Sequence, residues 1–170
     1  MGLSIAISGG IVLFALLYIL LTLPSIINQT VSITKASTEI SEVENSILKT
    51  NINMQAIYAA SGSRAINFTV SNTGTEKLWN FENFNLIITY PVSGQTRSEL
   101  LSYAGTCSGP PSSGTWCITA FNSDKVDPKI LNTDESISIR SRVTQTPISG
   151  TVSVAISTDN GVVATNATST

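Results

Sequence analysis

The sequence predicts an all-β domain, an immunoglobulin-like antiparallel sandwich, preceded by a long N-terminal α-helix. Two observations predict this arrangement. The run from Leu3 to Ile27 contains no charged side chain. From Asn51 onward, apolar and polar residues alternate with the period of two that is typical of half-buried β-strands.

The N-terminal run is long enough to cross a membrane. At about 1.5 Å per residue, a helix over Leu3–Ile27 would reach about 37 Å, which exceeds the roughly 30 Å hydrocarbon core of a bilayer. A cleaved signal peptide would need a basic segment before the apolar run, and the sequence starts directly with MGLSIAISGG. We therefore expect residues 1–27 to form a retained transmembrane helix.

An amphipathic helical extension is predicted over residues 28–50. Apolar residues recur there at steps of three and four, while Glu39, Glu42 and Glu44 keep the other faces charged. The apolar stripe consists of Ile33, Ala36, Ile40, Val43 and Ile47. It could pack on the chain's own domain, or it could be a helix–helix assembly stripe that meets other chains. The sequence does not separate these two alternatives.

Residues 51–170 are predicted to form the β-sandwich domain. About seven or eight short strands are separated by turns rich in Gly, Pro, Asn and Ser, which is the pattern of an antiparallel sandwich. The predicted strands are Met54–Ala59, Ile66–Val70, Leu86–Tyr90, Arg97–Tyr103, Thr115–Phe121, Ser136–Val143, Gly150–Thr158 and Val162–Thr165. The large side chains Trp79, Phe81, Phe84 and Trp116 are expected in the core.

The two cysteines of the chain, Cys107 and Cys117, flank the turn-rich run SGPPSSGTW. A disulfide closing this loop would contribute about 3 kcal/mol, and two buried free thiols are the alternative. A zinc site would need further ligands that the chain lacks. A disulfide indicates an oxidising space outside the cytoplasm. Possible N-glycosylation sites at Asn28, Asn67 and Asn166 indicate the same location.

The composition argues against an enzyme. The chain has no His, the commonest general base and neutral metal ligand, and it has no phosphate-binding or nucleophile motif. We expect no catalytic residue, metal site, cofactor or small-molecule substrate. The loop Asp124–Glu135 carries carboxylates that could bind calcium, but their spacing does not match an EF-hand and a solvated loop is favoured. With a net charge of −2 and no basic cluster, nucleic acid is not an expected partner.

Several motifs together resemble a known family. A short MGLS start leads into the apolar helix, and SNTGTEKLW (Ser71–Trp79), NLIITY (Asn85–Tyr90) and DPKILNTDE (Asp127–Glu135) follow in that order. The chain resembles the archaellin-related accessory proteins of the archaellum, or archaeal flagellum, of the FlaF/FlaG type, over nearly its whole length. The resemblance implies a type IV pilin-like architecture, with an N-terminal helix shared with those pilins and an immunoglobulin-like domain outside the cytoplasm.

For the accessory proteins the resemblance implies a non-enzymatic, stator-like part of the motility machinery. Such a protein crosses the cell membrane once and docks its outer domain to the surface layer. The expected partners are the membrane, a surface-layer protein or other archaellum or pilus subunits, and further copies of the chain in a homo-oligomer. The alternative is an archaellin or archaeal type IV pilus-like filament subunit. Those subunits carry a short basic leader, and no Lys or Arg precedes Leu3, which favours the stator.

Overall fold

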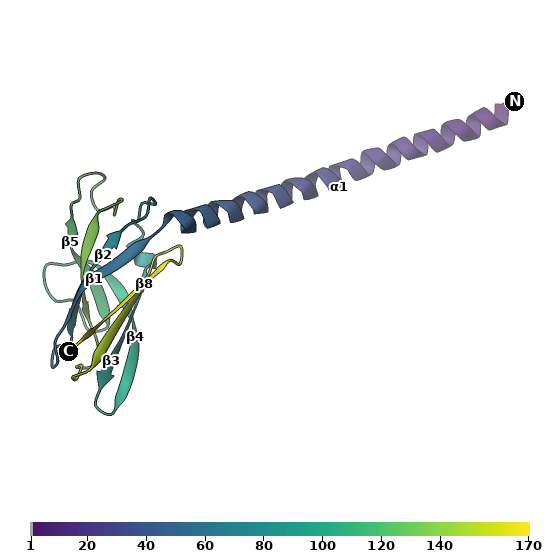
Figure 1. Ribbon diagram of the computed structural model, residues 1–170. Coiled ribbons are helices and arrows are strands. Elements are labelled where there is room, and N and C mark those ends of the chain that lie inside the picture. Colours follow the sequence, from purple (N-terminus) through teal and green to yellow (C-terminus); the bar gives the residue numbers. More distant parts are fainter. Residues whose placement is uncertain (1) are drawn as a thin grey trace. The chain divides into compact units, whose positions relative to one another are not determined.

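The computed structural model describes residues 2–170, with the side chains of residues 2–6, 23 and 25–28 left out of the description. Within that range it contains one long helix, a single 3-10 turn and eight strands (Figure 1). The elements are α1 (Gly2–Lys49), β1 (Ile52–Ala59), β2 (Ala65–Asn72), η1 (Phe81–Asn83), β3 (Asn85–Val92), β4 (Gln95–Thr106), β5 (Thr115–Asn122), β6 (Ser136–Arg142), β7 (Thr151–Ser157) and β8 (Val163–Ser169).

The two predicted helical segments belong to one continuous helix, α1, which runs for 48 residues and contains Pro24. The chain divides into two compact units, one ending at Glu44 and the other spanning Asn45–Thr170. The last turn of α1 therefore belongs to the unit that contains all the strands.

Alternation of apolar and polar residues explains where the strands form. In β2, Ile66, Phe68 and Val70 are buried and the residues between them are half-buried. The same alternation recurs in β3 and β6. Each predicted strand overlaps an observed one, because period-two alternation is a local signal that needs no knowledge of the pairing partner.

The strands form one hydrogen-bonded order, β1-β2-β6-β5-β4-β3-β7-β8. Strand β4 is twelve residues long and changes partner along its length. Its first part pairs antiparallel with β3 up to Leu101, and its second part pairs parallel with β5 from Ser102. The purely antiparallel arrangement predicted from the sequence is therefore wrong at this pair, and the immunoglobulin-like sandwich remains a prediction.

The loop between β4 and β5 explains the parallel pair. A hairpin would need a short turn of two to about five residues. The segment Cys107–Gly114 instead contains Pro110 and Pro111, which fix an extended backbone and carry no N–H for a turn hydrogen bond. The chain returns along β4 before β5 begins, and the N–H of Ser102 donates to the carbonyl of Gly114 at 3.1 Å.

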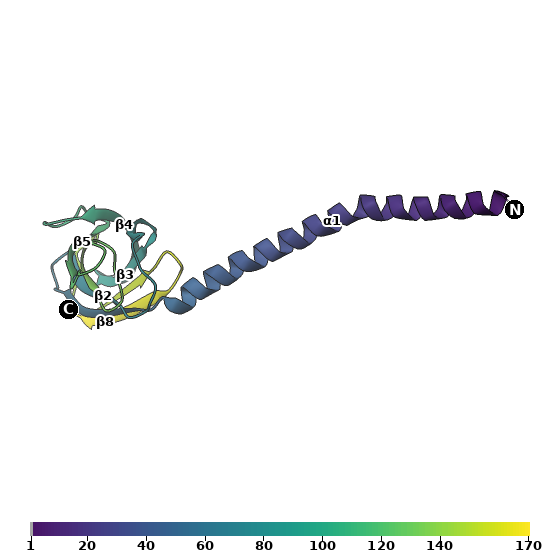
Figure 2. The ribbon, with the colours of Figure 1, turned by 90° about the horizontal axis from the view of Figure 1, so that it is seen from above.

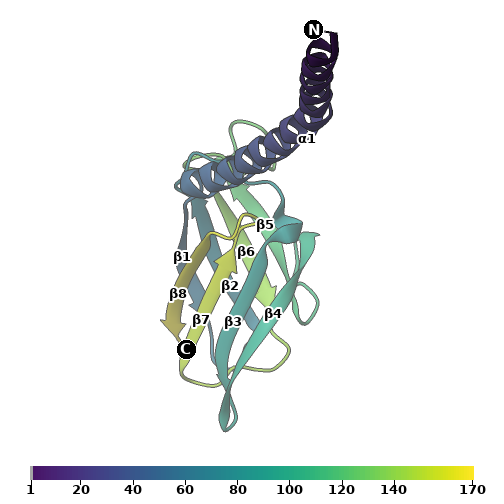
Figure 3. The same ribbon diagram turned by 90° about the vertical axis from the view of Figure 1, so that its right-hand side faces the viewer.

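The two edge strands of the sheet come together, so that the sheet is nearly closed (Figures 2 and 3). The side-chain amide of Asn166 in β8 donates to the carbonyl of Met54 in β1 at 3.0 Å. The strands enclose a core of aliphatic and aromatic side chains in which Trp116 and Tyr90 are fully buried. Phe81 and Phe84 also lie in this core, as the sequence predicts.

Candidate functional site

The two most specific sequence motifs meet in the structure. Ser71–Trp79 continues from β2 and Asp127–Glu135 leads into β6, and these two strands are neighbours in the sheet. Asn72, a residue of the first motif, is fully buried where the two motifs meet. Its side-chain nitrogen donates to the carbonyl of Leu131 at 3.0 Å and to that of Glu76 at 2.7 Å. A buried amide with these partners fixes the two motifs against each other.

Backbone pairing extends this contact beyond Asn72. The N–H of Leu78 donates to the carbonyl of Leu131 at 3.1 Å, and the N–H of Leu131 donates back to Leu78 at 2.7 Å. Both leucine side chains are buried. The N–H of Asn72 donates to the carbonyl of Glu135 at 3.0 Å. The motifs therefore form one structural cluster, although about fifty residues separate them along the chain.

Three carboxylates of the acidic loop Asp124–Glu135, those of Asp124, Asp127 and Glu135, bond to other groups of the protein. Glu135 is buried and accepts from the N–H groups of Asn132 at 2.9 Å and Lys125 at 3.2 Å. The bond from the Asn132 backbone holds the pKa of Glu135 below its ordinary value. Asp127 pairs with Lys77 at 2.5 Å. Within the part of the chain that the structure describes, no group of three or more His, Cys, Asp or Glu side chains could hold a metal ion.

The first motif also fastens the end of α1. The N–H groups of Thr75 and Glu76 donate to the carbonyl of Lys49 at 2.8 and 3.1 Å. Those of Thr73 and Gly74 donate to the carbonyl of Asn51 at 2.8 and 3.0 Å. A helix end leaves carbonyls without partners, and this loop supplies donors to one of them.

Gly74 makes this close approach possible. A Cβ atom at position 74 would lie 2.3 Å from the carbonyl oxygen of Lys49 and 2.4 Å from the nitrogen of Asn51. Both are backbone atoms, which cannot swing aside as a side chain can. The glycine of the SNTG motif is therefore required by packing rather than by an unusual backbone angle.

A third segment, the turn between β7 and β8, completes the contact with the helix end. The side-chain nitrogen of Asn160 donates to the hydroxyl of Thr50 at 2.6 Å and to that of Ser46 at 3.2 Å. Its oxygen accepts from the hydroxyl of Thr158 at 2.5 Å. We call the residues Ser46–Asn51, Asn72–Glu76 and Asn160 the junction.

The predicted assembly stripe is exposed on the isolated chain. Ile33, Ile40 and Val43 expose 70%, 60% and 57% of their surface, and Ala36 is also exposed. Ile47, which lies in the same compact unit as the strands, is 40% exposed. Its role as an assembly surface remains a prediction.

The predicted membrane segment is also apolar and exposed where its side chains are described. The large apolar residues between Ile7 and Leu21 expose half of their surface or more. The side chains at residues 3–6, 23 and 25–27 of the predicted span lie outside the described ones. Among the described residues, no helical stretch has the combined length and hydropathy needed to cross a bilayer.

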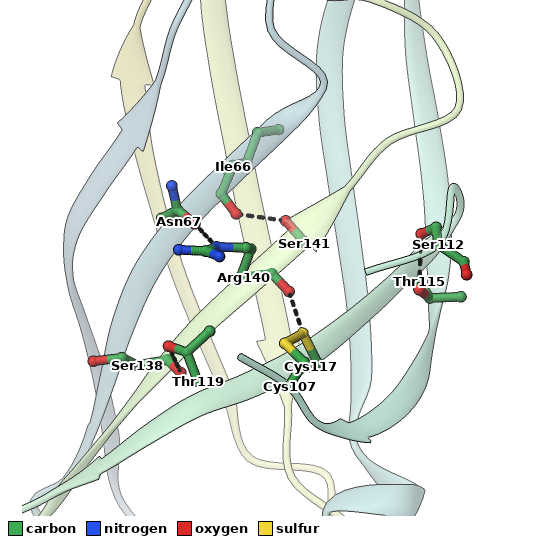
Figure 4. Close-up of a disulfide and its surroundings, with 10 residues drawn as sticks. All are labelled: Ile66, Asn67, Cys107, Ser112, Thr115, Cys117, Thr119, Ser138, Arg140 and Ser141. Atoms are coloured by element: carbon green, nitrogen blue, oxygen red, sulfur yellow. Dashed lines mark hydrogen bonds between the residues drawn. A yellow bond between two sulfur atoms is a disulfide. The ribbon is translucent and has the colours of Figure 1, made fainter. Parts of the chain in front are cut away.

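Cys107 and Cys117 form a disulfide, with their Cα atoms 5.9 Å apart (Figure 4). The disulfide joins the end of β4 to β5, and these are the two strands that pair in parallel. The sulfur of Cys117 is buried, 3.6 Å from the carbonyl oxygen of Arg140 on β6. The disulfide therefore closes the loop that creates the parallel pair.

The predicted glycosylation sites lie in different surroundings. The side chain of Asn28 is outside the described ones. The oxygen of Asn67 accepts from Arg140 at 3.2 Å, and its amide nitrogen points away from that bond (Figure 4). Asn166 is exposed, but its nitrogen donates to the carbonyl of Met54. A glycan is therefore accommodated more easily on Asn67 than on Asn166, and all three sites remain predictions.

An open groove beside η1 was not predicted from the sequence. It consists of two hollows of about 480 and 330 Å³ that share Glu82 and Tyr103 in their linings. Trp79 lines the smaller hollow and Leu100 the larger. Trp79 was expected in the core but is 65% exposed, because it follows a single bridge residue, Leu78, and not an alternating strand. We call this feature the aromatic groove.

Comparisons with known proteins find similar solved structures, at low sequence identity. No protein-family model matches the chain, and no curated protein does either. Among solved structures, the chain is similar to the archaellum periplasmic stator protein FlaG from Sulfolobus acidocaldarius, with a TM-score of 0.49 and 16% identity, over 70% of this chain and 99% of that one.

A second solved structure is the archaellum periplasmic stator protein complex of FlaF and FlaG from Sulfolobus acidocaldarius. The TM-score is again 0.49 at 16% identity, and the match covers 69% of this chain and 87% of that one.

Proposed function

We propose that this protein is a non-enzymatic structural component of the archaellum motility machinery, with a stator-like role. Its N-terminal helix anchors it in the cell membrane, and its β-domain lies outside the cytoplasm and docks to the surface layer. The charge-free run Leu3–Ile27 supports the anchor. The disulfide between Cys107 and Cys117 supports the location of the domain.

One observation carries the proposal. The first of the motifs that resemble the FlaF/FlaG family fastens the end of α1, through the backbone N–H groups of Thr73–Glu76, and Asn72 holds this motif against the second one. A component that resists torque must transmit force between its anchor and its docking domain. The backbone hydrogen bonds of the junction, which do not depend on side-chain rotamers, are suited to this task.

Deleting the gene tests the proposal. Cells without a stator component should still carry archaellum filaments in electron micrographs but should not swim, and the wild-type chain should restore swimming. Protease added to intact cells should remove the β-domain. Normal swimming of the deletion strain would refute the proposed role. Full protection of the domain from protease would refute the proposed orientation.

The exposed stripe favours a second candidate, a filament subunit whose helix packs among the helices of neighbouring copies. Ile33, Ala36, Ile40 and Val43 lie beyond the run that a bilayer would cover. In a filament these residues would be buried by other chains. In that case the deletion strain should carry no filaments, which separates the two candidates.

Cysteine crosslinking tests the stripe directly. The native cysteines are paired, so a cysteine introduced at Ile40 or Val43 is the free thiol of the variant chain. A ladder of high oligomers supports a filament, and a single dimer or mixed band supports a stator. Thr38→Cys, on the opposite face of the helix, is the matched control. Absence of any crosslink at Ile40 and Val43 would contradict an intermolecular role for the stripe.

A further inference from the structure

The aromatic groove combines a flat apolar surface with polar side chains. The indole of Trp79 is 65% exposed, and Asn80 and Glu82 line the hollow beside it. Asn85 lines the adjoining hollow with Glu82. The hollows, of about 330 and 480 Å³, are within the range of small-ligand sites.

The polar side chains of the groove are free to bind a ligand. In the described part of the chain, no hydrogen bond or ion pair connects the side chains of Asn80, Glu82 or Asn85 to another residue. The Glu82 carboxylate accepts hydrogen bonds, and the two amides both donate and accept them. These are the groups that recognise hydroxyl groups.

The charge of the groove restricts the class of ligand. Neither hollow is lined by Lys or Arg, and Glu82 is the one charged group in either lining. Burial and the Glu82 charge both raise the pKa of Tyr103, so its hydroxyl stays protonated and can donate. An anionic ligand would be repelled by Glu82 without compensation.

A cationic ligand fits less well than a neutral one. Cation-binding cages surround the charge with several exposed aromatic faces. Here Phe81 is 5% exposed and Phe84 3% exposed, so Trp79 and the half-buried Tyr103 are the aromatic side chains that a ligand could reach, too few to surround a cation. Glu82 and the amide oxygens could accept from an ammonium group, but the amide donors of Asn80 and Asn85 would find no acceptor there.

An added β-strand from a partner protein is also disfavoured. Beyond Leu101, β4 has lost its pairing with β3, which leaves one edge open. Gly105 has a φ of +80°, and the β4 register shifts between Tyr103 and Thr106. A bulge at this position interrupts the regular ladder that an incoming strand requires.

We propose that the aromatic groove binds a neutral carbohydrate, with one sugar ring stacked on Trp79 and its hydroxyl groups bonded to Asn80 and Glu82. The apolar face of a pyranose ring matches an indole. The polar side chains that line the same hollow match the hydroxyl groups of the sugar. Asn85 and Tyr103 extend the site toward a second sugar. This site does not depend on the membrane anchor or on a role in motility.

Titration with soluble sugars tests the site. The full chain is held in a detergent without a sugar headgroup and titrated with neutral trisaccharides of mannose, glucose and N-acetylglucosamine. Binding is measured by calorimetry and by iodide quenching of tryptophan fluorescence. Iodide reaches the exposed Trp79 but not Trp116, which is fully buried, so a bound sugar should protect the quenchable fraction.

Variants assign the binding to the groove. Trp79→Ala should weaken binding about tenfold or more, and Glu82→Gln should weaken it about fivefold. Val126→Ala, which removes an apolar side chain that is 59% exposed and lies in neither lining, should leave binding unchanged. The near-ultraviolet circular dichroism of Trp116 reports whether each variant is folded.

The proposal is overturned if no neutral trisaccharide binds at about 10 mM, or if Trp79→Ala binds as well as the wild type while folded. Binding of sialyllactose or choline in preference to the neutral sugars would also overturn it, because those ligands are charged. Binding of a protein partner alone, with no sugar, would assign the groove to a different class of ligand.

Discussion

Replacing Gly74 with alanine tests whether the junction holds the end of α1 as described. The new Cβ would lie 2.3 Å from the carbonyl oxygen of Lys49, against the 3.4 Å at which ordinary contact begins. Because the obstructing atoms are backbone, the two segments must separate by about 1 Å. This separation affects the four hydrogen bonds donated by residues 73–76 to Lys49 and Asn51.

The cost follows from those four bonds. Each contributes about 0.5–1.5 kcal/mol net, and water replaces part of the loss at this partly exposed site. We expect the free energy of unfolding to fall by about 3 kcal/mol. For a domain of this size the melting temperature should drop by about 10 °C.

The assay is thermal unfolding of the full chain in detergent, followed by the near-ultraviolet circular dichroism of the buried Trp116. Gly109→Ala is the matched control, because a Cβ there would meet nothing within 4 Å. It should change the free energy of unfolding by less than about 0.5 kcal/mol. Equal melting temperatures for Gly74→Ala and Gly109→Ala would refute the described packing of the junction.

Three further predictions concern the β-domain. Reducing the Cys107–Cys117 disulfide should lower the free energy of unfolding by about 3 kcal/mol, measured in denaturant with and without a thiol reductant. Glu99→Gln should destabilise the domain by about 1–3 kcal/mol at neutral pH. Burial would raise the pKa of Glu99, but hydrogen bonds from Thr144, Tyr90 and Arg97 outweigh it and hold the pKa below its ordinary value. The stability that the ionised carboxylate provides should therefore be present above about pH 4.3 and be lost as the pH falls, so the two melting curves converge in acid. Asn160→Ala should cost about 1–2 kcal/mol, because the hydroxyl of the buried Thr50 loses its donor, and an unchanged melting temperature would contradict that contact.

Local patterns in the sequence were sufficient to locate the strands and most of the core. Ile66, Phe68 and Val70 alternate with polar residues, so their burial on one face follows from the geometry of any strand. The same logic failed at Trp79. A large aromatic residue in a connecting segment carries no periodicity, and only the surrounding packing decides whether it is buried.

Features that depend on pairing between distant segments could not be predicted. The parallel pairing of β4 with β5 depends on how the loop after Cys107 returns, which the alternation of residues does not encode. The meeting of the two motifs at Asn72 depends on β2 and β6 being neighbours. The aromatic groove forms because β4 continues beyond the end of its pairing with β3.

The side-by-side arrangement of β1 and β8 has a consequence for the biosynthesis of the domain. Strand β1 is bonded to β8 through Asn166, which donates to Met54. The helix end is bonded to Asn160, which donates to Thr50. A ribosome makes these late residues more than a hundred positions after the early ones. Residues 73–76 can bond the helix end early in synthesis, but the contacts of Asn160 and the closure of the sheet require the late residues. The sheet can close only after β8 has been made, which leaves the exposed early strands dependent on protection from aggregation until then.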